Sequence, residues 1–159
     1  MKRLLLIALL TFGCYIWAAR ADTHTDTKDG HVILMPDALQ WKPNPMLPPG
    51  AQATILSGDP TKAGSVYAIR LKVPDGFKIP LHWHPSAENV TVLKGTLMIG
   101  VGEKVDPDKL KAVPAGGFMQ MPKQMRHFGM ARGETILQLH GVGPFQINYV
   151  NPADDPRNK

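Results

Sequence analysis

The sequence predicts a single all-β domain, built as a sandwich or as a closed barrel. Three observations carry this prediction: short apolar segments recur at regular spacing, glycine and proline stand at nearly every junction between them, and no long segment keeps a helical period. Many short strands in one small domain are typical of two sheets that share one core. The 159 residues are enough for one such core.

The expected strands follow one another between residues 53 and 150. They are placed at residues 53–57, 65–73, 78–84, 89–93, 96–101, 117–121, 127–131, 135–142 and 145–150. Turns such as Pro74-Asp75-Gly76 and Lys94-Gly95 separate them, and glycine tolerates the positive φ of a tight turn. Only residues 106–111 are expected to form a helical turn. We therefore assign residues 51–150 to the barrel.

The first 21 residues have the pattern of a cleaved secretory signal peptide. A basic start at Lys2 and Arg3 precedes an almost wholly apolar run, and Ala19-Arg20-Ala21 matches a small-x-small cleavage site. The apolar run is shorter than the roughly 20 residues that cross a bilayer. We expect cleavage before Asp22, no membrane contact of the mature chain, and a periplasmic or secreted protein.

Cleavage changes both charge and cysteine content. The formal net charge falls from +5 to +2, because three basic residues and no acidic residue are lost. The remaining lysines and arginines are scattered, which argues against a nucleic-acid partner. Cys14 is the only cysteine, so the mature domain has neither a disulfide nor a thiol nucleophile. The residues before Cys14 do not fit a lipoprotein signal, which makes acylation the weaker alternative.

The segments on either side of the barrel lack strand patterns. Within the leading segment, residues 22–50, a polar stretch precedes residues 36–49, whose five prolines predict an extended arm. Trp41 in this Pro-rich arm could plug the barrel mouth or dock onto a second subunit, and a homodimer is compatible with either. Residues 151–159 form a polar tail that we expect on the surface.

Residues 76–95 carry the pattern that points to chemistry. Side chains alternate along a strand, so His82 and His84 face one space while Trp83 faces the opposite side. Pro85 then ends ladder pairing, and Glu88 opens the next strand, where its carboxylate can return beside the imidazoles. Isolated histidines are usually ordinary core or surface residues, but a buried cluster of this kind needs partners, and a metal ion would supply them.

These residues resemble the first motif of the cupin superfamily, G-x5-H-x-H-x3-E-x6-G. All five fixed positions match: Gly76, His82, His84, Glu88 and Gly95. The resemblance implies a double-stranded β-helix, a jelly-roll barrel with a metal ion inside one end.

The second cupin motif, G-x5-P-x-G-x2-H-x3-N, resembles residues 116–131. Gly116, Pro122 and His127 match, whereas Gln124 stands at the position of a glycine and Ala131 at that of an asparagine. Neither departure removes a ligand, so they bear on turn geometry more than on metal binding. The two motifs together imply His82, His84, Glu88 and His127 as the metal ligands.

Three imidazoles and one carboxylate suit Mn, Fe, Co, Ni, Cu or Zn better than Ca or Mg, and the sequence does not choose among these divalent metals. Four ligands on an octahedral ion leave two positions for a small-molecule substrate or dioxygen. The resemblance implies a metal-dependent dioxygenase or related oxidoreductase that acts on a small chelating or enolisable anion, such as a flavonol or diketone.

Three alternatives to dioxygenation stay open. Residues 81–84 also resemble oxalate-degrading cupins, but these carry an arginine three residues before the first histidine, where this chain has Ile79. A phosphosugar isomerase would use the same metal ligands, but no basic cluster that could bind a phosphate accompanies the motif in this sequence. A non-catalytic metal-binding or small-ligand-binding module, for sensing or storage, uses the same barrel.

His140 is a candidate catalytic group that would lie beside the metal ligands without binding the metal. It shares strand parity with Gln138 and could reach the pocket for hydrogen bonding or proton transfer. The alternative is a strand-end histidine that faces water.

Overall fold

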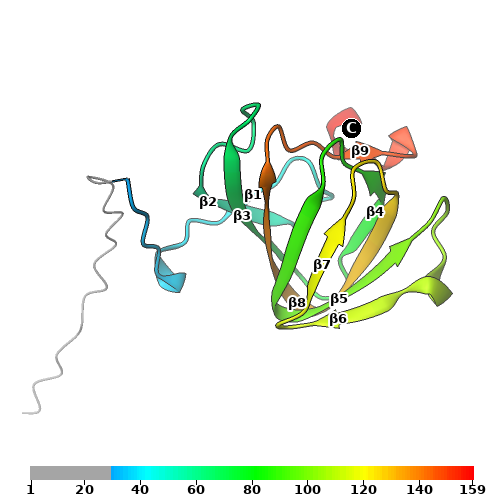
Figure 1. The fold of residues 1–159 in the computed structure, drawn as a ribbon. Coiled ribbons are helices and arrows are strands. Elements are labelled where there is room, and N and C mark those ends of the chain that lie inside the picture. Colours follow the sequence, from blue (N-terminus) through cyan, green and yellow to red (C-terminus); the bar gives the residue numbers. More distant parts are fainter. Residues whose placement is uncertain (1–29) are drawn as a thin grey trace, which may run out of the picture.

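The computed structural model describes residues 30–159, and the predicted signal peptide and most of the polar lead lie outside them. Within residues 30–159, nine strands form one strongly curled antiparallel sheet (Figure 1). The strands are β1 (Lys42–Pro43), β2 (Gln52–Ser57), β3 (Val66–Val73), β4 (Lys78–Trp83), β5 (Glu88–Val101), β6 (Lys111–Pro114), β7 (Phe118–Met121), β8 (His127–Val142) and β9 (Asn148–Tyr149). The predicted all-β barrel is confirmed.

Among residues 30–159, helical structure is confined to single 3-10 turns. These are η1 (Pro36–Ala38), η2 (Pro107–Lys109), η3 (Pro152–Asp154) and η4 (Pro156–Asn158). The turn η2 lies inside the one helical turn expected at residues 106–111. No helix in the described part of the chain is long and apolar enough to cross a membrane.

Strand β8 holds the barrel together because it pairs with three neighbours. The sheet runs in the order β1-β2-β3-β8-β4-β9, and β5 pairs with β8 and also with β6 and β7. The register places His82 of β4 and Val101 of β5 on either side of His127. Pairing of β4 with β8 therefore brings His82 of the first motif and His127 of the second motif to one end of the barrel.

The core follows from period-two alternation. On β3, Tyr67, Ile69, Leu71 and Val73 are buried while the residues between them are not. Buried aliphatic residues of β5 and of the neighbouring strand β8 belong to the same core cluster. Each fully buried aliphatic side chain contributes roughly 1.5–3 kcal/mol relative to an exposed one, so this inward face dominates stability.

Strands β5 and β8 are longer than predicted. The sequence predicts two strands at residues 89–93 and 96–101, joined by a tight turn, and two more at residues 127–131 and 135–142. In the structure each of these pairs forms one continuous strand. The prediction was wrong because Gly95, with φ 72°, sits in a register shift between Lys94 and Thr96 rather than in a turn. Such a register shift lets a long strand continue where a turn is expected.

Gly95 is required there for a second reason. A Cβ at this position would lie 2.5 Å from the carbonyl oxygen of Glu134 and 2.6 Å from the hydroxyl oxygen of Thr135. Thr135 is fully buried, so it cannot move aside into solvent. The motif glycine thus allows β8 to approach β5 closely at the register shift.

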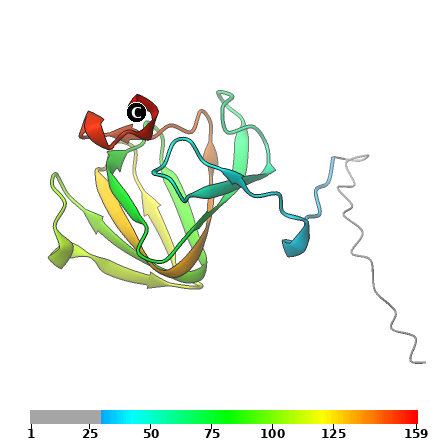
Figure 2. The ribbon, with the colours of Figure 1, turned by 180° about the vertical axis from the view of Figure 1, so that it is seen from behind.

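The arm joins the sheet through β1, which pairs with β2 as an edge strand, while residues 30–40 extend away from the barrel (Figures 1 and 2). Trp41 does not line the cavity inside the barrel. It packs against β3 instead, with the Lys72 ammonium 4.6 Å from its ring centroid. The interpretation of Trp41 as a plug of the barrel mouth is therefore wrong.

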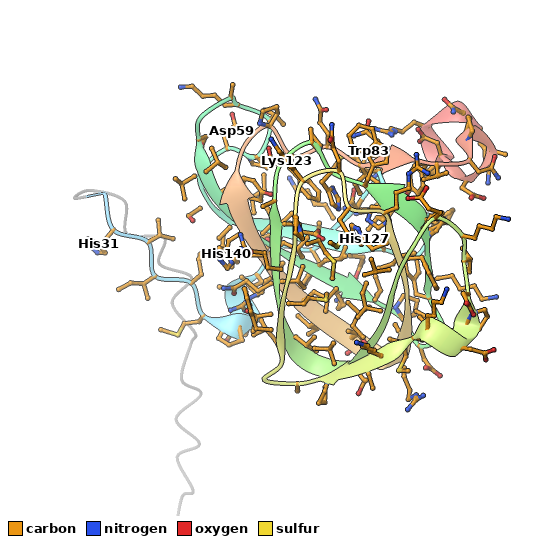
Figure 3. The ribbon with its side chains drawn as sticks, turned by 45° about the vertical axis from the view of Figure 1, so that its right-hand side comes forward. His31, Asp59, Trp83, Lys123, His127 and His140 are labelled. Carbon is orange, nitrogen blue, oxygen red and sulfur yellow. The ribbon has the colours of Figure 1, made fainter. Side chains whose placement is uncertain are left out.

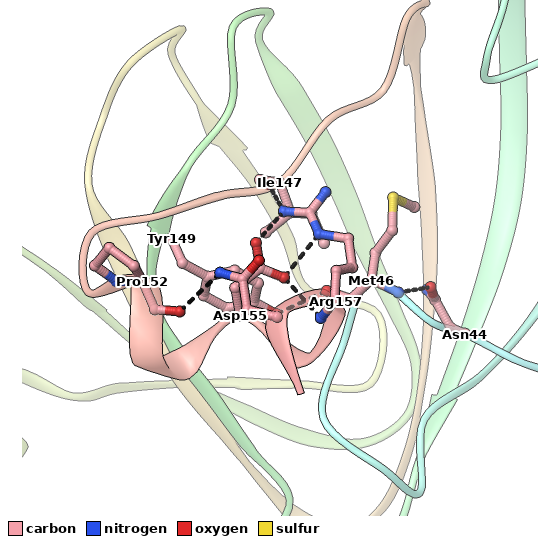
Figure 4. A network of polar contacts seen from close by, with 8 residues as sticks. Asn44, Met46, Ile147, Tyr149, Pro152, Asp155 and Arg157 are labelled. Atoms are coloured by element: carbon pink, nitrogen blue, oxygen red, sulfur yellow. Dashed lines mark hydrogen bonds and ion pairs between the residues drawn. The ribbon is translucent and has the colours of Figure 1, made fainter.

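The polar tail closes over the end of the barrel where β4 and β9 lie (Figure 1). Arg157 forms an ion pair with Asp155, and its guanidinium donates a hydrogen bond to the carbonyl of Ile147 at 2.8 Å (Figure 4). This contact fixes the segment that leads into β9.

Candidate metal centre

Four side chains of the two motifs converge at one end of the barrel. His82 lies near the end of β4, His84 directly follows that strand, Glu88 begins β5 and His127 begins β8. All four are buried, with relative exposures between 3% and 7%, whereas Trp83 between the first two histidines is only half-buried. The alternation expected from the sequence accounts for this difference.

The three histidines form the tightest part of the cluster. They offer donor atoms that all lie within 4.8 Å of one another. The Oε2 atom of Glu88 lies 3.5 Å from Nε2 of His84 and 3.5 Å from Nε2 of His127. Glu88 therefore approaches two of the three imidazoles and is not a member of the mutually close set.

Backbone carbonyls orient every imidazole of the cluster. Nδ1 lies 2.7 Å from the carbonyl oxygen of Pro80 in His82, 2.6 Å from that of Gln146 in His84 and 2.9 Å from that of Met125 in His127. A carbonyl oxygen only accepts hydrogen bonds, so Nδ1 is the protonated nitrogen in each ring. The lone pairs of Nε2 are then left for the interior.

The pKa values fit a site built for a cation. Burial, together with the imidazoles of His127 and His84, lowers the pKa of His82 to about 3, so this ring is neutral at physiological pH. Burial opposes a charge on His84, but the nearby Glu88 carboxylate and the carbonyl of Gln146 together outweigh burial and raise the pKa of His84. The pKa of Glu88 is far below its usual range: burial alone would raise it, but the imidazoles of His127 and His84 overcome the effect of burial.

A divalent metal ion fits this donor set. The Nε2 atom of His84 is buried and has no hydrogen-bond partner within the described residues. An unpaired buried polar atom costs free energy, and here it faces a carboxylate that also lacks a proton to share. An ion bound by imidazole nitrogens and a carboxylate oxygen would satisfy all of these atoms, and such mixed ligands suit a transition metal.

The loop before His127 is fastened to the first motif. The amide of Gln124 donates a hydrogen bond to the carbonyl of His84 at 2.8 Å. Gln124 has φ 64°, the left-handed conformation that the glycine of the second motif adopts without strain. The departure from the motif changes the residue but keeps the turn, so His127 still reaches the site.

His140 does not belong to the centre. It is exposed, whereas Leu137 and Leu139 on the same strand are buried and line the cavity. Figure 3 shows His140 well apart from His127. The prediction that His140 donates hydrogen bonds or protons in the pocket is therefore wrong, since alternation places Gln138 and His140 on the outer face of β8.

The cluster closes the polar end of an otherwise apolar cavity of about 40 Å³. Aliphatic, methionine and phenylalanine side chains form most of its wall, among them Ile79, and no lysine or arginine of the described chain lines it. We refer to it as the inner cavity. It has room for an ion and a few water-sized ligands.

Two groups at the site escaped the sequence-based prediction. The ring of Phe145 stacks on the imidazole of His84, with centroids 5.1 Å apart and planes at 23°. The neighbouring Gln146 supplies the carbonyl that orients the same imidazole. Both lie about 60 residues from His84 in a segment without a motif, so only the fold reveals them.

Comparisons with known proteins agree on the fold. No family model and no curated protein sequence matches the chain. Among solved structures, the polyketide cyclase RemF of Streptomyces resistomycificus is similar with a TM-score of 0.63 and 16% identity, over 80% of this chain and 91% of that one. A candidate acetylacetone dioxygenase from Methylibium petroleiphilum gives a TM-score of 0.60 and 18% identity, over 82% and 88%.

A third similar structure is described as a cupin. An RmlC-like cupin from Shewanella frigidimarina is similar with a TM-score of 0.53 and 13% identity, over 75% of this chain and 91% of that one. The curled antiparallel sheet and the convergence of both motifs at one barrel end lead to the same assignment. This chain has the fold of the cupin superfamily.

Proposed function

We propose that the chain binds one divalent transition metal ion through His82, His84, His127 and Glu88 and catalyses the oxidation of a small chelating compound by dioxygen. The observation that carries this proposal is the buried Nε2 atom of His84, which faces the Glu88 carboxylate without a hydrogen bond. A bound ion would supply Lewis acidity, lowering the pKa of an enol oxygen, and a site for electron transfer.

The protein's own groups have three tasks in this proposal. The backbone carbonyls hold each imidazole with Nε2 toward the interior. Glu88 adds one negative charge, so that a divalent site keeps a net charge near +1 and attracts an enolate. The apolar wall excludes bulk water from the reacting atoms.

The wall also favours diketone-like over oxalate-like substrates. Ile79, at the position where oxalate-degrading cupins have arginine, lines the inner cavity. A dianion would find no cationic side chain there, whereas an enolisable compound with apolar substituents would meet complementary surface. The similarity to a candidate acetylacetone dioxygenase supports the same substrate class.

One observation favours a second function, a metal-binding or small-ligand-binding module without turnover. The inner cavity measures only about 40 Å³, less than a ring-sized substrate requires. Metal analysis and oxygen uptake separate the two functions. Stoichiometric metal with oxygen consumption on an enolisable diketone supports the proposed oxidation by dioxygen. Stoichiometric metal without turnover on any diketone supports the binding module.

We also propose that the chain is exported after cleavage before Asp22, on the strength of the N-terminal pattern alone. N-terminal sequencing of the protein from a periplasmic or culture fraction tests this, and a cytoplasmic protein that retains Lys2 and Arg3 would contradict it. The homodimer stays a prediction that light scattering would test.

A further inference from the structure

A second and larger cavity adjoins the inner cavity, between the arm and strand β2. It has a volume of about 450 Å³. Residues 40–46 of the arm form one wall, and β2 with Pro60 and Thr61 forms the other. We call it the outer groove.

The outer groove and the inner cavity share a wall. Asn44, Ile69 and Phe145 line both. Phe145 is half-buried, its ring stacks on His84, and its amide donates a hydrogen bond to the carbonyl of Pro60 at 2.7 Å. Among the three shared residues, Phe145 is thus the one whose ring stacks on an imidazole of the cluster.

The arm side of the groove is held in place by hydrogen bonds. The hydroxyl of Tyr149 donates to the carbonyl of Met46 at 2.7 Å, and the amide of Met46 donates to Oδ1 of Asn44 at 3.0 Å (Figure 4). The amide of Asn44 donates in turn to the carbonyl of Ala51. Burial, aided by the charge of Asp155, raises the pKa of Tyr149 to about 12, so the hydroxyl keeps its proton.

The lining of the groove indicates the chemistry of its occupant. Proline, methionine, isoleucine and phenylalanine side chains provide most of the surface, and Lys42 is the one charged residue among those that line it. Such a surface suits an apolar body with no more than a single negative charge. The inner cavity, in contrast, offers metal ligands but little volume.

We propose that the outer groove binds the apolar body of an elongated ligand, whose small chelating head reaches the inner cavity past Phe145. This inference rests on the proposed function, because it needs a metal ion at the histidines. Phe145 is then the residue that determines how large a head can enter. The 40 Å³ of the inner cavity no longer limits the size of the whole substrate.

The first test follows metal removal from the Co²⁺-loaded, full-length mature protein. The probe is 4-(2-pyridylazo)resorcinol, a chelator with an aromatic body. We expect Phe145→Ala to raise the second-order extraction rate at least tenfold and Ile55→Trp, which fills the groove, to lower it at least fivefold. Phe118→Ala and Val66→Trp are matched controls, since both residues are exposed and neither lines a cavity.

The second test uses a short and a long diketone. Benzoylacetone has a phenyl ring in place of one methyl group of acetylacetone. The binding of both diketones to the Co²⁺ protein can be followed by absorbance. Ile55→Trp should weaken benzoylacetone binding at least tenfold and leave acetylacetone within twofold. Val66→Trp should change neither affinity.

The outcomes separate this inference from the function on which it rests. A wild-type protein that binds no metal would refute both. Bound metal with diketones that do not bind would contradict the proposed substrate class, while the extraction rates would still decide the route. Extraction rates that do not depend on chelator concentration, or that stay within twofold in Phe145→Ala and Ile55→Trp, would overturn the inference.

Discussion

Replacing Glu88 by glutamine removes the one negative charge of the metal centre with little change in shape. The Oε2 atom lies 3.5 Å from Nε2 of both His84 and His127, and we take this separation as the working distance. A unit negative charge at this distance from a divalent ion contributes about 9 kcal/mol at an effective dielectric constant of 20. The glutamine oxygen can still bind the ion, and burial of the carboxylate offsets part of the attraction, so we assign about a quarter of this value to the charge itself.

The expected loss is therefore about 2.5 kcal/mol of binding free energy, or roughly 60-fold in the metal Kd. Competition with a chelator of known affinity, at fixed pH and ionic strength, measures this ratio. Glu134→Gln is the matched control, because Glu134 pairs with Lys94 on the surface and lies outside the cavities. A Glu88→Gln Kd within threefold of the wild-type value would refute the electrostatic role of Glu88.

Three further predictions concern the turns and the pH response. Gly95→Ala should lower the free energy of unfolding by about 2–4 kcal/mol in chemical denaturation, because the positive φ and the clash of the new Cβ act together. Gly76→Ala is the control: its φ is also positive but its Cβ would meet open space, so the loss should be only about 1 kcal/mol. Equal losses in the two variants would contradict a close approach of β8 at Gly95. Gln124→Gly should relieve left-handed strain and stabilise the protein by about 0.5–1 kcal/mol, and a lowered melting temperature would contradict this. The raised pKa of His84 means that protons compete for Nε2 as pH falls, so metal affinity should decrease from pH 7.5 to 5.5; an unchanged Kd would speak against His84 as a ligand.

The part of the site that could be predicted from the sequence is the part that local geometry determines. Alternation along a single strand is enough to place His82 and His84 on one face. His127 needed the resemblance to a second motif, because its position opposite His82 depends on pairing between strands far apart in sequence. Neither argument could show that Glu88 approaches only two of the imidazoles.

The errors have equally specific causes. Gly95 was assigned to a turn because positive φ occurs in turns and in bulges alike, and only the register of β5 on β8 distinguishes them. His140 was considered for the pocket although Leu137 and Leu139 alternate with it, a signal that already placed the two leucines on the inner face. Phe145 gave no signal, since its role comes from contact with a residue about 60 positions away.

We infer that Nε2 atoms of three histidines hold a divalent ion at the end of the barrel. Anomalous diffraction from crystals of the protein loaded with one equivalent of Co²⁺ would locate this ion. We predict a single strong peak bonded to Nε2 of His82, His84 and His127, with Nδ1 of each ring still donating to its backbone carbonyl. A stoichiometric ion elsewhere, or one bonded through Nδ1 of these rings, would contradict the account.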